Sequence, residues 1–236
     1  TQTKGETVLE TLANWGAEAP GNWPELACAR VAQAFEDTVA CMIAGADDLS
    51  PLKVRKGIAG WGSGDASVVG QAAKAPAPWA AMANGAAAHA LDYDDNVQVV
   101  LGHTSAVQVP ALLALGEAVG ATGAQLIDAY IVGFEIGMVL GNGVNWSHYN
   151  IGWHSTSTII EIGTAGACGR LLGLDRVGMA HALSLGTSMA CGPKAQFGSM
   201  AKSFHAGLAA HHAVTSAQLA AAGLEGRMEV LEAPMG

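Results

Sequence analysis

The sequence predicts an all-α protein, a large bundle of about eight helices joined by short loops, with no linker between residues 1 and 236. Half of the 236 residues are hydrophobic and only 13% are charged, against about a quarter in an ordinary soluble domain. Most helix surfaces must therefore be buried in a core or against a partner. The 31 glycines are scattered through apolar segments, which favours helix backbones in close contact. ASVVG, at 66–70, is the one short run that resembles a strand.

Proline marks the starts of the first three helices. Pro24 precedes ELACARVAQAFEDTVACMIAG, which predicts a long helix ending in glycine. Ser50 as N-cap, with Pro51 at the first helical position, predicts the second helix. Pro78 opens an alanine-rich helix that continues to about Leu91.

The middle of the chain predicts two more helices. Pro110 begins PALLALGEAVG, and its last residue, Gly120, is a helix stop. Thr122 with Gln125 three residues later has the form of a capping box, in which each side chain bonds the other residue's backbone N–H. This pair precedes the long apolar run AQLIDAYIVGFEIGMVLG.

Three helices complete the bundle. Thr158 with Glu161 repeats the capping-box form before IGTAGACGRLLG. Asp175 is the expected N-cap of RVGMAHALSLGTSMA. The last helix is expected over 203–222, with Gly223 as its stop.

Composition excludes several classes of function. The net charge of −9 and the lack of a basic stripe disfavour nucleic acid as a partner. The most apolar stretches, 125–144 and 159–174, each carry two charged residues, so no membrane span is expected. The four cysteines form no C-x-x-C pair, which disfavours zinc and iron–sulfur sites and fits a reducing cytoplasm.

Polar residues cluster in three stretches, LDYDDNVQVVLGHTS, SHYNIGWHSTST and GPKAQFGSMAKSFHAG. Each stretch precedes a helical segment, and helix N-termini attract anions. If the three meet at one end of the bundle, His103, His154 and Lys202 would line a carboxylate-binding pocket suited to proton transfer. A metal site of Asp92, His103 and His154 is an alternative that no compact H-x-x-x-H spacing supports.

Several polar residues have simpler expected roles. Asp94 and Asp95 are expected to cap a helix, shape the turn or face water. His89 and His181 lie inside apolar helices and are expected to be hydrogen-bonded core groups. His211 and His212 are adjacent, so they cannot share a helix face, and both are expected to be structural.

Four segments, in this order, carry a family resemblance: NGAAAHALDYDD, GHTSAVQVPALLALGE, GWHSTST and GSMAKSFHAGLAA. They resemble the MmgE/PrpD family, which includes 2-methylcitrate dehydratase, cis-aconitate decarboxylase and iminodisuccinate epimerase. The resemblance extends from about Val8 to Leu231 and covers nearly the whole chain.

The resemblance implies an all-helical first domain, here 1–236, and a smaller α+β lid domain that lies outside these residues. It also implies a homodimer, a small polycarboxylate substrate and catalysis without a metal ion or organic cofactor. The chain is then expected to be a fragment of the enzyme, the partner of a separate lid-domain chain, or a domain that has lost the activity.

Motif by motif, the resemblance assigns catalytic roles to Asp92, His103, His154 and Lys202. The two histidines transfer protons next to a substrate carboxylate. Lys202 binds and polarises that carboxylate, and Asp92 orients an imidazole. The positions assigned to substrate binding are Asn96, Ser155 and Thr156.

The expected function is a cofactor-independent lyase, a dehydratase or decarboxylase of small di- or tricarboxylic acids, in the cytoplasm. SHYNIGWHSTST looks closest to the epimerase branch, so an isomerase of that type is an alternative. Leu101, however, stands where that branch carries an arginine, which would remove a cation from the site. The other alternative is a non-catalytic helical scaffold that needs a separate lid chain.

Overall fold

The computed structural model describes residues 5–234, so residues 1–4 and 235–236 of the expected domain lie outside the described residues. Within the described part the protein is all-α, as predicted, with ten α-helices, two 3₁₀ turns and no strand. The helices are α1 (Val8–Glu18), α2 (Glu25–Gly45), α3 (Leu49–Ile58), α4 (Ala77–Ala88), α5 (Ser105–Val119), α6 (Gly123–Val144), α7 (Ser147–Asn150), α8 (Ile159–Leu171), α9 (Arg176–Met189) and α10 (Met200–Ala221). The 3₁₀ turns are η1 (Ser155–Ser157) and η2 (Lys194–Gln196).

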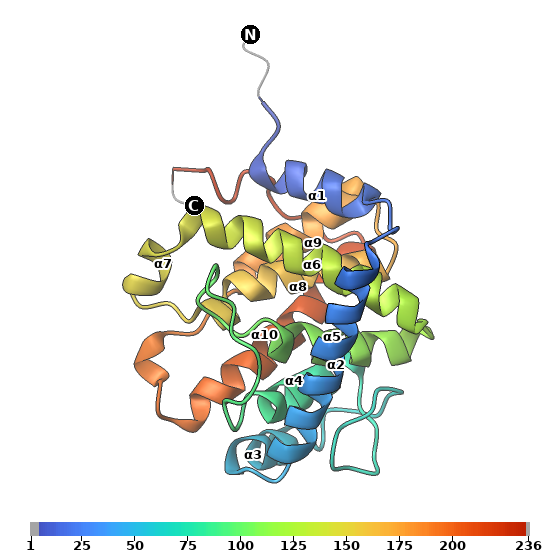
Figure 1. Cartoon of the computed structure of the whole chain (residues 1–236), viewed down its shortest axis with the longest axis vertical. Coiled ribbons are helices and arrows are strands. Elements are labelled where there is room, and N and C mark those ends of the chain that lie inside the picture. The colour runs from blue at the N-terminus through green and yellow to red at the C-terminus, as the bar shows by residue number, and fades with distance from the viewer. Residues whose placement is uncertain (1–4, 235–236) are drawn as a thin grey trace.

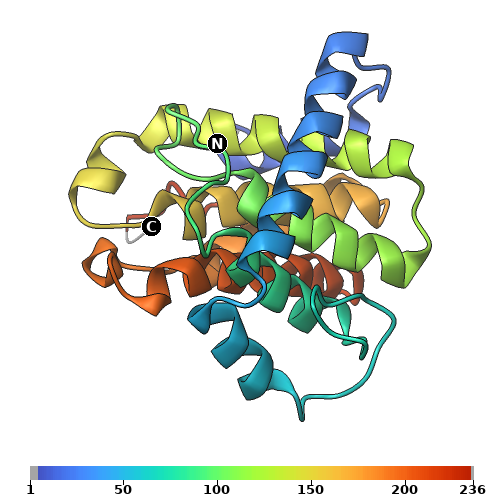
Figure 2. The same cartoon turned by 60° about the horizontal axis from the view of Figure 1, so that its bottom comes forward.

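The long helices form stacked layers. α8 packs against both α6 and α10, and the three lie side by side (Figure 2). α4 and α5 pack on the other side of α10, while α2 crosses over the outside of α4, α5 and α6. α1 packs on α9 and covers one end of the layers (Figure 1).

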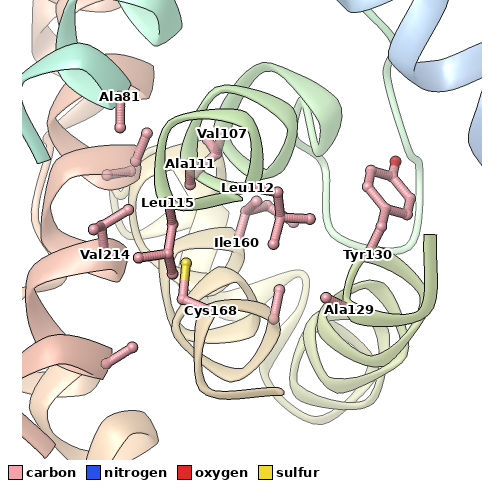
Figure 3. Close-up of a cluster of buried hydrophobic side chains, with 14 of the residues drawn as sticks. Ala81, Val107, Ala111, Leu112, Leu115, Ala129, Tyr130, Ile160, Cys168 and Val214 are labelled. Carbon is pink, nitrogen blue, oxygen red and sulfur yellow. The ribbon is translucent and has the colours of Figure 1, made fainter. Parts of the chain in front are cut away.

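The core surrounds α5 and α8, which are buried on nearly every side. All residues of α8 over 159–169 are buried, as expected for a helix that is apolar all round. Figure 3 shows Leu112 of α5 beside Ile160 of α8, and Leu115 between Cys168 of α8 and Val214 of α10. These contacts join the central layers into one hydrophobic core.

Glycines bring helix backbones into direct contact, as the composition predicts. A methyl group built on Gly163 of α8 would lie 2.6 Å from the carbonyl oxygen of Gly133 and 3.0 Å from Cα of Gly137, both in α6. A methyl group on Gly85 of α4 would lie 2.8 Å from Cα of Gly207 in α10. Only glycine fits at these crossings.

The predicted helices are all present, and several predicted ends are confirmed. α2 follows Pro24, as expected. Thr122 and Gln125 form a reciprocal capping box at the start of α6. The Asp175 carboxylate accepts a hydrogen bond of 2.8 Å from the backbone N–H of Gly178 and caps α9.

Two helices go beyond the eight expected. α1 begins with a capping box in which Thr7 Oγ1 accepts from the Glu10 N–H at 3.2 Å and Glu10 accepts from the Thr7 N–H at 2.9 Å. The T-x-x-E spacing of this box is the same signal that predicts α6. α7 is a single turn of four residues, too short to leave a periodic pattern.

Three predicted helix starts are displaced, and α10 begins at Met200, three residues before the expected start. α5 begins at Ser105, so Pro110 lies inside the helix, where its missing N–H leaves one backbone carbonyl without its usual partner. The stop at Gly120 is confirmed by its left-handed φ of 69°. The N-cap of α3 is Asp48, whose carboxylate accepts from the Ser50 N–H at 3.1 Å.

Two further predictions are wrong. ASVVG forms no strand, because Ala66 makes only an isolated bridge. Thr158 and Glu161 form no capping box: the Thr158 hydroxyl donates to a backbone carbonyl at 3.2 Å, and Glu161 is fully buried with Oε2 3.4 Å from His212 Nδ1. Burial raises the pKa of Glu161 well above its ordinary value.

α6 is long and apolar enough to cross a membrane by length and composition alone. Half of its most apolar window is buried inside the protein, against α8 and its neighbours. A core helix passes the same test, so the expectation of no membrane span is not contradicted.

Gly163→Ala tests the backbone contact. The added methyl group would overlap the backbone of α6, so we expect the free energy of unfolding to fall by about 1–3 kcal/mol. Gly57→Ala in α3 is the matched control, since nothing lies within 4 Å of its added methyl group. Alanine is favoured there by up to about 1 kcal/mol. Urea denaturation measures the free energy of unfolding of both variants. Equal changes in Gly163→Ala and Gly57→Ala would contradict the backbone contact at Gly163.

Candidate active site

The three polar stretches meet at one end of the bundle, as predicted. The loops before α5, around α7 and before α10 (green, yellow and orange) gather on one side of the molecule in both views (Figures 1 and 2). They enclose a pocket of about 360 Å³. Its lining residues are Asp92, Asn96, Leu101, His103, Tyr149, His154, Phe197, Gly198 and Lys202.

Backbone contacts fasten the loops to one another. The backbone N–H of His103 donates to Thr156 Oγ1 at 3.1 Å, which ties the first loop to the second. The N–H of His154 donates to the Gly192 carbonyl at 2.9 Å, which ties the second loop to the third. Asp92 adopts a left-handed φ of 59°, so the chain turns sharply where its carboxylates begin.

Asp92 and Lys202 form an ion pair at the mouth of the pocket. Asp92 Oδ1 also lies 3.7 Å from Nε2 of His103. Burial would raise the pKa of Asp92, but the hydrogen bond and charge of Lys202 outweigh burial and lower it. Asp92 is therefore ionised and mainly engaged with the lysine.

Asp94 corrects one sequence expectation, since it neither faces water nor caps a helix. Its side chain is fully buried and accepts a 2.8 Å hydrogen bond from Nδ1 of His89. The same oxygen lies 3.0 Å from Nδ1 of His103, an ion-pair distance. Burial opposes ionisation, but the two imidazoles hold the pKa of Asp94 well below its ordinary value. His89 is hydrogen-bonded and buried, as predicted.

Asp95 has a separate role that matches the expected capping. Its carboxylate accepts hydrogen bonds from the backbone N–H of Ser105 at 3.0 Å and from its hydroxyl at 2.5 Å, at the first residue of α5. Burial raises the pKa of Asp95. Asp95 also borders a second cavity of about 300 Å³ between α2 and α6, whose lining is mostly apolar.

The two pocket histidines have opposite electrostatic surroundings. Burial disfavours charge on His103, but the carboxylates of Asp94 and Asp92 outweigh burial and raise its pKa. His154 is 2% exposed, and burial, reinforced by nearby His89, His205 and Lys202, lowers its pKa to about 2.

His154 has its own partners. Its Nδ1 lies 3.2 Å from Nδ1 of His205, so one of the two rings donates to the other. The edge of the Phe197 ring packs against it, with ring centroids 4.8 Å apart. His154 is thus held as a neutral imidazole.

The expected substrate-binding residues separate into two groups. Asn96 lines the pocket. Ser155 and Thr156 are fully buried behind it, where Thr156 holds the backbone of His103. Tyr149 and Phe197 line the pocket although the sequence analysis did not single them out. Both lie within the polar stretches, but a lone aromatic residue in a loop or in the single turn of α7 gives no periodic signal.

Four side chains could hold a metal ion, since one donor atom from each lies within 4.8 Å of the others: His89, Asp92, Asp94 and His103. This set differs from the expected alternative, because His154 faces His205 instead. The four donors already pair with one another and with Lys202, so they balance their charges as a protonic network.

Comparisons with known proteins show the family to which this chain is similar. A family model described as the MmgE/PrpD N-terminal domain matches residues 10–236. A cis-aconitate decarboxylase of Aspergillus terreus is 31% identical over 238 residues, which cover 97% of this chain and 49% of that protein. The human cis-aconitate decarboxylase is 33% identical over 166 residues, 68% of this chain and 34% of that protein. The chain spans about half the length, or less, of these relatives.

The neutral state of His154 predicts a pH dependence of stability. In the unfolded chain this histidine titrates near pH 6.5, so below that pH the unfolded state binds a proton that the folded state does not. Stability must then fall as the pH falls. Between pH 7.5 and 5, we expect the free energy of unfolding of His154→Asn to fall by about 2 kcal/mol less than that of the wild type. Urea denaturation at both pH values measures this, and parallel losses would contradict a neutral His154.

Proposed function

The chain belongs to the MmgE/PrpD family, and from this premise we propose that it supplies the proton-transfer wall of a lyase for small tricarboxylic acids. The relatives support a dehydratase or decarboxylase. Of these two reactions, we propose decarboxylation of a substrate of the cis-aconitate class.

The opposite charge states of His103 and His154 carry the proposal. Decarboxylation leaves an electron pair on carbon, and that carbon needs a proton donor but no base. Dehydration and epimerisation begin with removal of a proton from carbon, which needs a base with a pKa near the working pH. His154, with a pKa lowered to about 2, is a weak base. His103, with a raised pKa, stays protonated to a higher pH than a free imidazole and so has a proton to donate, which suits decarboxylation.

The proposed step is as follows. The bond from carbon to the departing carboxylate breaks and CO₂ leaves with no net change in oxidation state. The electron pair spreads onto a neighbouring carboxylate, where the ammonium of Lys202 stabilises the charge. The carbon then takes a proton from Nε2 of His103, and solvent restores that proton. His154 remains neutral and hydrogen-bonds substrate oxygen.

Binding exchanges one ion pair for another. The Lys202 ammonium pairs with Asp92, and a substrate carboxylate competes for the same cation. Asn96 lines the pocket and can donate a hydrogen bond to a second carboxylate. We assign Thr156 to holding the loops, because it is buried behind the lining and its Oγ1 accepts from the backbone N–H of His103. Ser155 is buried there as well.

Two observations favour a lyase over an epimerase. The named relatives are decarboxylases. Leu101 lines the pocket with an apolar side chain, where the epimerase branch would carry an arginine for a second carboxylate.

We also propose that the reaction uses no metal or organic cofactor, and that the chain works as a homodimer in the cytoplasm. The four cysteines are free thiols, which suits a reducing compartment. A lid domain, on the same or a separate chain, would complete the pocket. No nucleic acid or membrane partner is proposed.

Lys202→Met tests substrate binding. Loss of a charge-assisted hydrogen bond costs about 1.5–3 kcal/mol, so we expect cis-aconitate to bind roughly ten-fold or more weakly by isothermal titration calorimetry. Lys56→Met removes the same charge from the exposed face of α3 and is the matched control. Equal binding by both variants would remove Lys202 from the site.

Turnover of cis-aconitate in D₂O tests the reaction class. For a decarboxylase we expect one deuterium in the product per CO₂ released and none in unreacted substrate, measured by mass spectrometry. Deuterium exchange into a racemisable dicarboxylate without CO₂ release would support the epimerase instead. Binding without turnover of any acid would support the scaffold.

A further inference from the structure

Asp94 occupies an unusual position between two imidazoles. Its side chain has no exposed surface, and one of its oxygens faces Nδ1 of both His89 and His103, at 2.8 Å and 3.0 Å. The two rings lie edge to face, with centroids 4.5 Å apart. An ionised carboxylate is only an acceptor, so a proton on Nδ1 makes each of these approaches favourable. The contact with His89 is a hydrogen bond, whereas the contact with His103 is at ion-pair distance without hydrogen-bond geometry.

We propose that Asp94 is a positioning residue for His103: it holds a proton on Nδ1, leaves Nε2 as the atom that faces the pocket, and stabilises the imidazolium. This role is distinct from substrate contact, since Asp94 is absent from the pocket lining. Its consequence for catalysis rests on the proposed function, whereas its effect on His103 does not.

Asp92 is less suited to this role, although the sequence analysis gave it the orienting of an imidazole. Its side chain is 55% exposed, it pairs with Lys202, and it approaches the Nε2 side of His103 at 3.7 Å. A substrate carboxylate would compete for the lysine and disturb that arrangement. Asp94 touches neither the lysine nor solvent, so its contact with His103 persists when substrate binds.

His89 holds Asp94 in place. Its Nδ1–H donates to Asp94, and its Nε2 is buried without a hydrogen-bond partner. The ring of His89 also stacks on His154, with centroids 5.9 Å apart. The charged and titratable groups that act on His103 are therefore Asp94, Asp92, Asp95, Lys202, His89 and His154.

Nitrogen NMR of ¹⁵N-histidine in the 236-residue chain tests the positioning directly. In the wild type we expect neutral His103 to be the Nδ1–H tautomer and to titrate above pH 6.5. In Asp94→Asn we expect the titration midpoint to fall by at least one unit and the tautomer preference to weaken. Asp95→Asn removes the neighbouring buried carboxylate, which bonds Ser105 instead and acts on His103 only through its charge, so it should lower the His103 midpoint much less than Asp94→Asn does.

Two results would overturn the proposal. One is an unchanged His103 titration in folded Asp94→Asn, with folding checked by circular dichroism. The other is an Nε2–H tautomer for His103 in the wild type, a measurement that needs no variant and stands even if Asp94→Asn does not fold.

A kinetic arm separates this proposal from the proposed function. If the charged form of His103 donates the proton, kcat falls as the pH rises through its pKa, and Asp94→Asn should move this alkaline limb to lower pH. We expect kcat to drop at least ten-fold while KM for cis-aconitate changes little. Absence of wild-type turnover when the chain is supplied with its lid domain, with the NMR result intact, would refute only the lyase. Turnover with an unchanged alkaline limb in Asp94→Asn would refute only the role of Asp94.

Discussion

Contact between helix backbones is the constraint on which the rest of the structure depends. Where Gly163 meets Gly133, and where Gly85 meets Gly207, the paired helices cannot slide without losing close packing or meeting a backbone clash. Small residues along these crossings explain how a chain with so little charge and so much alanine buries its helices. The crossings hold the helices at fixed positions relative to one another. They therefore also fix where the loops before α5, α8 and α10 meet. Reactive side chains placed on those short loops gain the precision of the rigid elements behind them.

An apolar scaffold imposes strict rules on the charges it carries. A buried carboxylate is costly unless donors satisfy it, which applies to Asp94 and Asp95, and each of the three acids in this apolar segment has its own partners. The chain provides them: Lys202 for Asp92, two imidazoles for Asp94, and the start of α5 for Asp95. The acids differ in purpose because their partners differ. One can exchange its cation with a ligand, one tunes a histidine, and one holds a helix.

Local signals explain what was predictable. The capping box at Thr122 depends on four consecutive residues, so it could be identified without the fold. The same spacing at Thr158 and Glu161 failed because packing of α8 buries the glutamate beside His212, and tertiary contact overrides local preference. The gathering of the three loops was predictable from their shared place before helices. The proposed role of Asp94 was not predictable, because it depends on the left-handed turn that begins at Asp92. Such a turn gives no periodic pattern in the sequence.

Charge balance supports the proposal that a lid domain would complete this pocket. Among the described lining residues Lys202 is the one permanent cation, and His103 adds a second when protonated. A tricarboxylate brings up to three negative charges and, by taking Lys202, leaves Asp92 unpaired beside it. Two like charges 4 Å apart repel by about 4 kcal/mol near a protein surface, so tight binding requires further cations from a wall that faces these loops. Cations on that wall would be repelled by Lys202 and protonated His103, and the negative substrate would reduce this repulsion. In turn, the substrate would bind more tightly once the wall is closed. Closure and binding would therefore favour each other by the same free energy, and a closed pocket would also exclude the water that weakens the contacts of Lys202.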